Sequence, residues 1–241
     1  RKYRELGPSL VVWATTLIDR RGHAGALTKD FELAQYDPDT GKVVVRDIMV
    51  DGKKLSKPAP PVDWVPMWKL AQDGRTAYLI HMQDATLYTI DLLSEGDVVK
   101  GMSHAKMIEG NDVDIRSQLS IDPDGRVYAV VRIDNETGFG DGMLHHLVRF
   151  DPQREKMEDL GVLAVKIPGF YFDTPGAKLG HPVSGSAESP SYYGYHTLPD
   201  GTLTPLYTSH AVIVTRDGTI YVTIIYPFTL LKIEGPCLPK T

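Results

Sequence analysis

Short apolar runs, and no long amphipathic stretches, dominate the pattern of hydrophobic and polar positions along the chain. No window of a dozen residues keeps apolar positions at i, i+3, i+4 and i+7 free of glycine and proline. The runs are instead rich in β-branched residues and are bounded by Gly, Pro, Asp or Asn. They include residues 10–13, 43–45, 76–80, 127–131, 211–214 and 220–225. This pattern predicts an all-β chain of many short strands joined by tight turns.

One element of the pattern recurs three times, as an apolar run, an Asp-Gly turn and a second apolar run. The copies span residues 67–82, 118–133 and 211–226. A tyrosine (Tyr78, Tyr128 or Tyr221) follows each turn at nearly the same place. Asp-Gly suits a tight hairpin because glycine reaches positive φ without steric cost. We therefore expect three related hairpins.

A second element follows, made of a strand that ends in an acidic residue, a polar turn and another strand. Its copies span residues 32–50, 86–101 and 146–163. The strand ends Tyr36–Asp37, Ile90–Asp91 and Phe150–Asp151 recur after 54 and then 60 residues. Two hairpins in a repeat of this length give four strands, which is what one blade of a β-propeller requires.

The pairing of inner hairpins of the DG-x-Y form with outer hairpins like YDPDTGKVV resembles bacterial β-propellers of the SMP-30/YVTN/polysaccharide-lyase type. The resemblance covers most of the chain, from about Leu10 to Glu234. It implies a ring of four-stranded antiparallel blades. It is much less specific for function, because such blades serve lactonases, polysaccharide lyases, cofactor enzymes and plain binding scaffolds alike.

The strand phase predicts one β-propeller domain, or a fragment of one, over residues 1–241. Blades are expected at approximately 10–50, 64–103, 116–166 and 209–235, with an insertion at 167–208. The first blade is expected to begin at its second strand (10–18) and the last to stop after its third. This gives about 3.5 blades of a larger ring, to be completed by another protein chain, a second copy or further residues. A closed ring of four or five blades is the alternative, because the insertion has room for strands, including a hairpin at 192–208.

Composition narrows the classes of partner. The chain has 241 residues, 42% of them hydrophobic and 24% charged, and a formal net charge of -5. Net acidity argues against a nucleic-acid partner, whose binding depends on neutralising phosphates. No apolar run approaches the roughly 18 residues of a membrane span, and one cysteine, Cys237, excludes a disulfide framework. The charged opening RKYRELGPS is unlike a signal peptide, although a lyase-like bacterial protein would favour a secreted or periplasmic location.

Candidate chemistry is expected on the face that carries the longer and more varied loops, to which the strand phase assigns all eight histidines. His210 begins an inner strand and would point toward the mouth of the central channel, with Arg116, His81 and Tyr226 nearby. An arginine neutralises a carboxylate while a histidine or tyrosine moves a proton, which suits a lyase acting on an acidic carbohydrate. The alternative is that His210 and His81 are polar strand ends bonded to backbone carbonyls.

Further residues are candidates for binding a small-molecule or carbohydrate ligand at the same face. They are Trp64 and Asp114 in the channel-mouth layer, and Tyr193 and Tyr195 in a tyrosine-rich rim loop. Tyrosines there would stack on sugar rings or simply cover the sheet ends.

The metal content is left open by the sequence. His81, His210 and Asp114 would suit a divalent ion at the channel mouth, but no HxH or HExxH spacing supports one. The DPDTG turn that contains Asp37 is better explained by local hydrogen bonds than by calcium. Two functions therefore stay open: a ligand-binding or catalytic propeller, and a non-catalytic protein-interaction scaffold that forms a subunit of a larger complex.

Overall fold

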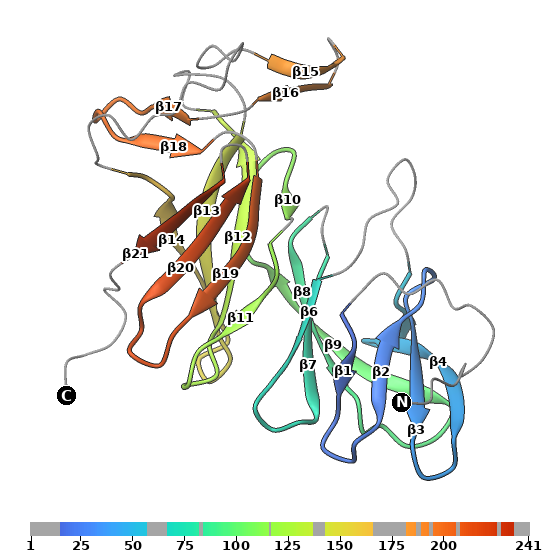
Figure 1. Ribbon diagram of the computed structural model, residues 1–241. Helices are drawn as coiled ribbons and strands as arrows, with labels where there is room; N and C mark the ends of the chain where they lie inside the picture. Colours follow the sequence, from blue (N-terminus) through green and yellow to red (C-terminus); the bar gives the residue numbers. More distant parts are fainter. Residues whose placement is uncertain are drawn as a thin grey trace, which may run out of the picture. The chain divides into compact units, whose positions relative to one another are not determined.

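The computed structural model describes ten segments of the chain, and all of its regular elements are β-strands. The described residues are 15–56, 67–81, 84–115, 117–136, 143–165, 182–186, 189–192, 195–205, 208–225 and 228–233. They contain 21 strands, β1 to β21 (Figure 1). In these segments there is no helix of the length and apolarity needed to cross a membrane. The prediction of an all-β chain is confirmed.

The first of two compact units comprises residues 1–82 and 86–105. It contains β1 (Leu17–Ile18), β2 (Ala24–Leu27), β3 (Glu32–Asp37), β4 (Lys42–Val50), β5 (Lys53–Lys54), β6 (Met67–Leu70), β7 (Thr76–Ile80), β8 (Thr86–Asp91) and β9 (Val98–Lys106). They form one sheet in the order β1-β2-β3-β4-β9-β8-β7-β6, with β5 added to β4. Two sets of four consecutive strands, β1–β4 and β6–β9, are thereby joined through their last strands. The joint is a parallel pairing in which Asp47–Val50 of β4 align with Val98–Gly101 of β9.

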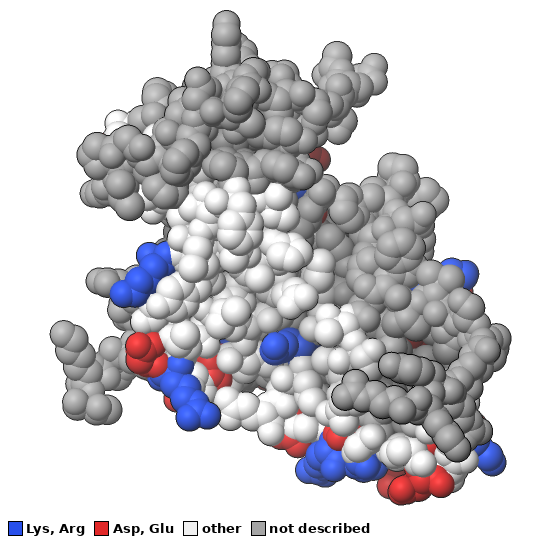
Figure 2. Space-filling view, in the orientation of Figure 1, with Lys and Arg blue, Asp and Glu red and all other residues white. Residues whose placement is uncertain are grey.

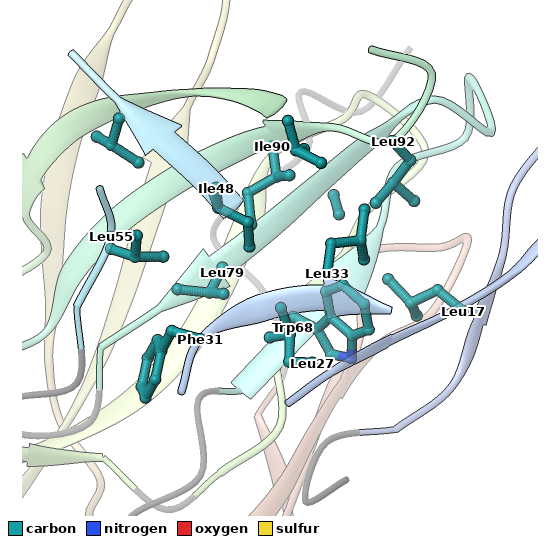
Figure 3. Packing of buried hydrophobic residues seen from close by; sticks show 13 residues of the cluster. Leu17, Leu27, Phe31, Leu33, Ile48, Leu55, Trp68, Leu79, Ile90 and Leu92 are labelled. Carbon is teal, nitrogen blue, oxygen red and sulfur yellow. The ribbon is translucent and has the colours of Figure 1, made fainter. Parts of the chain in front are cut away.

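The apolar side chains of this unit form a core that draws on both sets of strands (Figure 3). Leu33, Ile48, Leu79 and Ile90 are fully buried. Trp68 of β6 lies beside Leu27 and Leu33 in the close view, and its indole nitrogen donates to the carbonyl of Thr15. The core therefore ties β2, β3 and β4 to β6, β7 and β8.

The phase of the first sheet differs from the one expected from the sequence. Leu17–Ile18 was expected to end a second strand; instead, it forms β1 and pairs with β2, which pairs in turn with β3. The additional strand is β2, whose sequence AGAL gives little sign of a strand because glycine and alanine have low β-propensity. The described part of the first blade thus has four strands in order. Because β2 precedes the strand expected next, His23 lies in the β1–β2 turn and not in a loop after the second strand. Its Nε2 lies 3.6 Å from the Asp37 carboxylate.

The second unit comprises residues 83–85 and 106–241. Its strands are β10 (Asp114–Ile115), β11 (Ser120–Ile121), β12 (Val127–Asp134), β13 (Met143–Asp151), β14 (Lys156–Val162), β15 (Pro182–Ser186), β16 (Ser189–Tyr192), β17 (Tyr195–Thr197), β18 (Leu203–Pro205), β19 (Thr208–Val214), β20 (Ile220–Ile225) and β21 (Thr229–Ile233). They form a sheet β10-β12-β13-β14 with β11 added to β12, a sheet β19-β20-β21, and the hairpins β15–β16 and β17–β18. The hairpin expected within 192–208 is present as β17–β18.

The two larger sheets of this unit share one apolar core. Tyr128 and Val130 of β12 pack with Val212, Val222 and other buried residues of β19–β21. The sheets are not equally covered, however. All residues of β12 from Val127 to Arg132 are buried, whereas buried and partly exposed residues alternate along β20. Described residues therefore cover both faces of β12 and only one face of β20.

The expected Asp-Gly turns are present in the hairpins where the sequence places them. Gly74, Gly125, Gly201 and Gly218 all have positive φ, between 64° and 85°. In each repeat turn an aspartate caps the chain: Asp73 Oδ1, for example, accepts the backbone amides of Arg75 and Thr76. The DPDTG turn is closed in the same way, because Asp37 Oδ1 accepts the amides of Asp39 and Thr40.

Candidate functional site

The candidate residues from the sequence are only partly described by the structure. Arg116, Tyr226, Trp64 and Tyr193 lie outside the described residues. His81 belongs to the first unit, while His210, Asp114 and Tyr195 belong to the second. The expected cluster at a channel mouth is thus untested and stays a prediction.

The two candidate histidines have different surroundings. His81 follows β7, is 8% exposed, and its ring centroid lies 6.3 Å from that of Phe31. His210 is exposed on β19, at a register shift between Ser209 and Ala211. A bulge turns a side chain away from the regular alternation of the strand and is common beside active sites. Of the two candidate catalytic residues that the structure describes, His210 is therefore the one accessible in its own unit.

Asp114 takes part in a polar row across three strands of the second unit. Its Cα partner on β12 is Arg132, and the partner of Arg132 on β13 is His145. Residues opposite one another in a ladder share a face, so the three side chains are neighbours. The Asp114 carboxylate forms an ion pair with the Arg132 guanidinium, and His145 is fully buried. The row combines a carboxylate, a guanidinium and an imidazole, but its burial favours a structural role over a catalytic one.

The remaining polar candidates also form local contacts. His146, next to His145 on β13, points to the opposite face, and its Nδ1 lies 2.8 Å from Asp159. His104, expected in a connection between blades, lies within β9, where its Nε2 is 3.1 Å from the Thr89 hydroxyl. Tyr195 is fully buried and burial raises its pKa. No group of three or more His, Cys, Asp or Glu within the described segments is placed to hold a metal ion.

The first unit carries a pocket of about 500 Å³ that sequence reasoning did not anticipate. Four of its lining residues are cationic and two are acidic. The lining consists of Arg20, Arg21, Arg75, Asp91, Leu93, Ser94, Glu95 and Lys100. Figure 2 shows Lys and Arg side chains gathered among Asp and Glu side chains at the lower edge of the view, where the β1–β2 and β6–β7 turns lie in Figure 1. Excess positive charge in a pocket of a net acidic chain points to an anionic ligand.

Backbone contacts between turns position these cations. The amide of Arg20 donates to the carbonyl of Gly74 at 2.7 Å, which fixes the β1–β2 turn against the β6–β7 turn. Gly74 allows this approach, because a Cβ there would lie 2.9 Å from the Cβ of Arg20. The amide of Leu92 donates to the carbonyl of Arg75 at 3.0 Å, which brings the end of β8 to the same place. Three turns far apart in sequence thus present their side chains to one cavity.

The arginines of the pocket differ in how far their charge is already compensated. Arg75 forms a two-point ion pair with Asp91, at 2.8 and 2.7 Å, and this pairing lowers the pKa of the Asp91 carboxyl. Arg21 contacts the Asp19 carboxylate at 2.9 Å and the carbonyl of Leu92. For Arg20 and Lys100, no ion pair is seen among the described residues. Their charges act at longer range on Asp73 and Asp91, so these two cations are the least compensated of the pocket and can bind an anionic ligand.

Nearby groups confirm that positive charge is crowded here. Arg46 lies behind the pocket and donates to the carbonyls of Ser94 and Gly96. Burial lowers its pKa, and the charge of Arg21 lowers it further. An anion bound beside Arg21 would relieve that repulsion.

Comparisons with known proteins support the fold and do not identify an activity. No protein-family model and no curated protein matches the sequence. A solved structure of a Bacteroides thetaiotaomicron protein of unknown function is 9% identical with a TM-score of 0.50, and the match covers 92% of this chain and 46% of that one. The periplasmic gluconolactonase of Pseudomonas aeruginosa is 12% identical with a TM-score of 0.39, over 91% of this chain and 53% of that one. A putative 6-phosphogluconolactonase from Bacteroides uniformis is 14% identical with a TM-score of 0.38, over 92% and 53%.

The chain thus spans about half the length of these solved proteins. At such low identity the first comparison supports the fold alone. Together with the repeated antiparallel hairpins, it confirms the resemblance to bacterial β-propellers at the level of architecture. The chain is all-β and corresponds to a portion of a larger propeller.

Proposed function

We propose that this chain is a ligand-binding part of a bacterial-type β-propeller and that its ligand is a carbohydrate acid. The observation that carries the proposal is the pocket of the first unit, in which Arg20 and Lys100 face a cavity without an ion-pair partner among the described residues. A carboxylate accepts charge-assisted hydrogen bonds from such groups, and these are stronger than neutral ones. The lining also contains one hydroxyl side chain, that of Ser94, which can accept a further hydrogen bond from a sugar hydroxyl.

Calorimetric titration with galacturonate, and with galactose as the uncharged counterpart, tests this proposal. The expected result is binding of galacturonate only, weakened roughly ten-fold or more in R20A and K100A, since a hydrogen bond to a charged group contributes about 1.5–3 kcal/mol. K53A is the matched control, because Lys53 is an exposed lysine of the same unit that does not line the pocket. Equal binding of galactose, or equal loss in K53A, would contradict the proposal.

The finer proposal is a separate catalytic site, distinct from the first-unit pocket, at which His210, Arg116, His81 and Tyr226 take part in a lyase reaction on a polymer of such sugar acids. In that reaction a base removes the proton at C5 and the glycosidic oxygen at C4 leaves with a proton, which cleaves the polymer and forms a C4–C5 double bond. This proposal is supported by the position of His210, which is exposed at a bulge of β19. The expected product is an unsaturated uronate, which is detected by its ultraviolet absorbance. H210A and R116A should each abolish its formation while leaving galacturonate binding at the first-unit pocket intact. Product formation that survives both substitutions would exclude these residues from the chemistry.

A second candidate, the interaction scaffold, is favoured by one observation in the second unit. The uncovered face of β19–β21 carries Ile213 (58% exposed) and Leu230 (60%), with Phe228 (78%) just before β21. The surface over these strands is mostly uncharged (Figure 2). An apolar sheet face of this kind suits packing against another blade, from a separate chain or a second copy. The double variant I213D/L230D should lower any self-association seen by light scattering, while the single variant R154D, at an exposed position in the β13–β14 turn, leaves it unchanged.

A further inference from the structure

We propose that the pocket continues into a second cavity to form one groove, and that this groove takes an extended acidic oligosaccharide rather than a single sugar acid. The inference rests on the function proposed above and names the size and shape of the ligand. The second cavity has a volume of about 240 Å³. It is lined by Thr76, Thr89, Ile90, Asp91, Lys100, Gly101 and Met102.

The two cavities are connected by shared walls. Asp91 at the end of β8 and Lys100 of β9 line both of them. A ligand group held by Lys100 is therefore within reach of either cavity. The first cavity, of about 500 Å³, lies within the range of roughly 300–1,000 Å³ of small-molecule sites and accommodates the acidic sugar ring. The second supplies the additional space for a second ring.

The chemistry of the walls changes along the groove. The first cavity is dominated by Arg20, Arg21 and Arg75. Apart from the shared Asp91 and Lys100, the second is lined only by uncharged residues, among them two threonines and the 46% exposed side chain of Met102. An anionic group thus belongs at the first end, and a hydroxyl-rich or weakly apolar group at the second. A chain of sugar residues with an acidic end has this distribution.

The floor of the second cavity is rigid, which favours recognition of one shape. Gly101 lies where β8, β9 and β4 approach closely: a Cβ there would be 2.9 Å from the carbonyl oxygen of Thr89 and 3.1 Å from Cγ2 of Val50. The Thr89 hydroxyl is held by the His104 ring at 3.1 Å. A preorganised hydroxyl loses little entropy when it binds a ligand.

The test compares galacturonate with a trimer in which two galactose residues extend one terminal galacturonate, by calorimetric titration on the whole chain. Wild type is expected to bind the trimer at least ten-fold more tightly than the monomer. M102W fills the second cavity from an exposed position, and T89V removes the hydroxyl at constant shape. In both variants the trimer should lose its advantage, while the affinity for the monomer stays within about two-fold of wild type. Retained monomer binding also shows that the variants are folded.

The outcomes separate the two proposals. If the monomer binds and the trimer binds no more tightly in wild type, the groove is rejected and the proposed function stands. If neither binds to wild type, the proposed function fails. If a triglutamate peptide binds more tightly than the galacturonate-ended trimer, the groove recognises acidic peptides and the carbohydrate assignment is overturned. An unchanged trimer advantage in M102W and T89V also overturns the groove.

Discussion

Arginine serves opposite purposes in the two units. In the first, Arg75 is half exposed, pairs with the partly exposed Asp91, and lies beside cations that have no ion pair among the described residues. In the second, Arg132 is 8% exposed and its charge is met by Asp114 within a row that ends at the buried His145. Cations of the pocket that form no ion pair among the described residues can still pair with a ligand, whereas the charges of the buried row already pair within the folded chain. Burial, and not residue type, separates the two.

The largest expected effect is on the closed row. R132A leaves Asp114 without its ion-pair partner, and breaking a buried pair in this way costs about 3–5 kcal/mol. Urea denaturation should show that loss of stability. The double variant D114L/R132M replaces both charges and should recover most of it. A loss below 1 kcal/mol in R132A would mean that the row is solvated and available for chemistry, which would remove the contrast between the units.

Two glycines of the first sheet make the next comparison. In G101A the new methyl group meets the Thr89 carbonyl at 2.9 Å, and overpacking of this kind costs about 1–3 kcal/mol. In G25A the methyl group has only ordinary contacts, the nearest at 3.6 Å from Leu33 Cδ1. G25A should therefore be neutral or slightly stabilising in the same denaturation experiment. Equal behaviour of the two would show that β8, β9 and β4 do not approach as closely as described.

A smaller effect on stability is expected for the exposed ion pair between Arg75 and Asp91. R75A removes an exposed contact to Asp91 and should cost less than about 1 kcal/mol of stability. It should nevertheless weaken galacturonate binding, because it removes one of the pocket cations. A stability loss as large as that of R132A would show that the pocket is structural and that the contrast between the units is wrong.

The smallest effect is expected for a partly exposed ion-pair network on β13 and β14, in which Arg149 and Lys156 both pair with Glu158. Hydrogen bonds from Lys156 and Arg149 lower the pKa of Glu158 from 4.5 to about 2. A lowered carboxyl pKa contributes stability that is fully present above the unfolded-state value and is lost as the pH falls toward 2. Wild type should therefore lose more stability than E158Q between pH 4.5 and pH 2. Parallel pH profiles of the two proteins would exclude the contribution.

The fold was largely predictable because its signals are local. Each Asp-Gly turn and its flanking strands lie within 20 residues of sequence, and the hairpins they predict are present. The strand phase of the first sheet failed because β2 reads AGAL, in which small residues hide a strand that is stabilised by its neighbours.

The pocket could not be predicted, because its cations come from two turns and from β9, which meet only through pairings between residues distant in sequence. Arg20, Arg75 and Lys100 have no common motif in the sequence. The row of Arg132 and His145 with Asp114 was not predicted for a similar reason, because it depends on the register of three strands. The two candidate histidines lie in different units: His81 is buried in the first, and His210 is exposed at a bulge in the second.

The parallel joint between β4 and β9 has a consequence for how the chain is made. Residues 98–101 leave the ribosome about 51 residues after their partners at 47–50, a delay of roughly 3–10 s at 5–20 residues per second. During that interval the edge of β4 at residues 47–50 has no partner from β9. An unpaired edge is a template for intermolecular strand pairing. Synthesis of the nascent chain, rather than the finished protein, is thus the stage at which aggregation of the first unit is most to be expected.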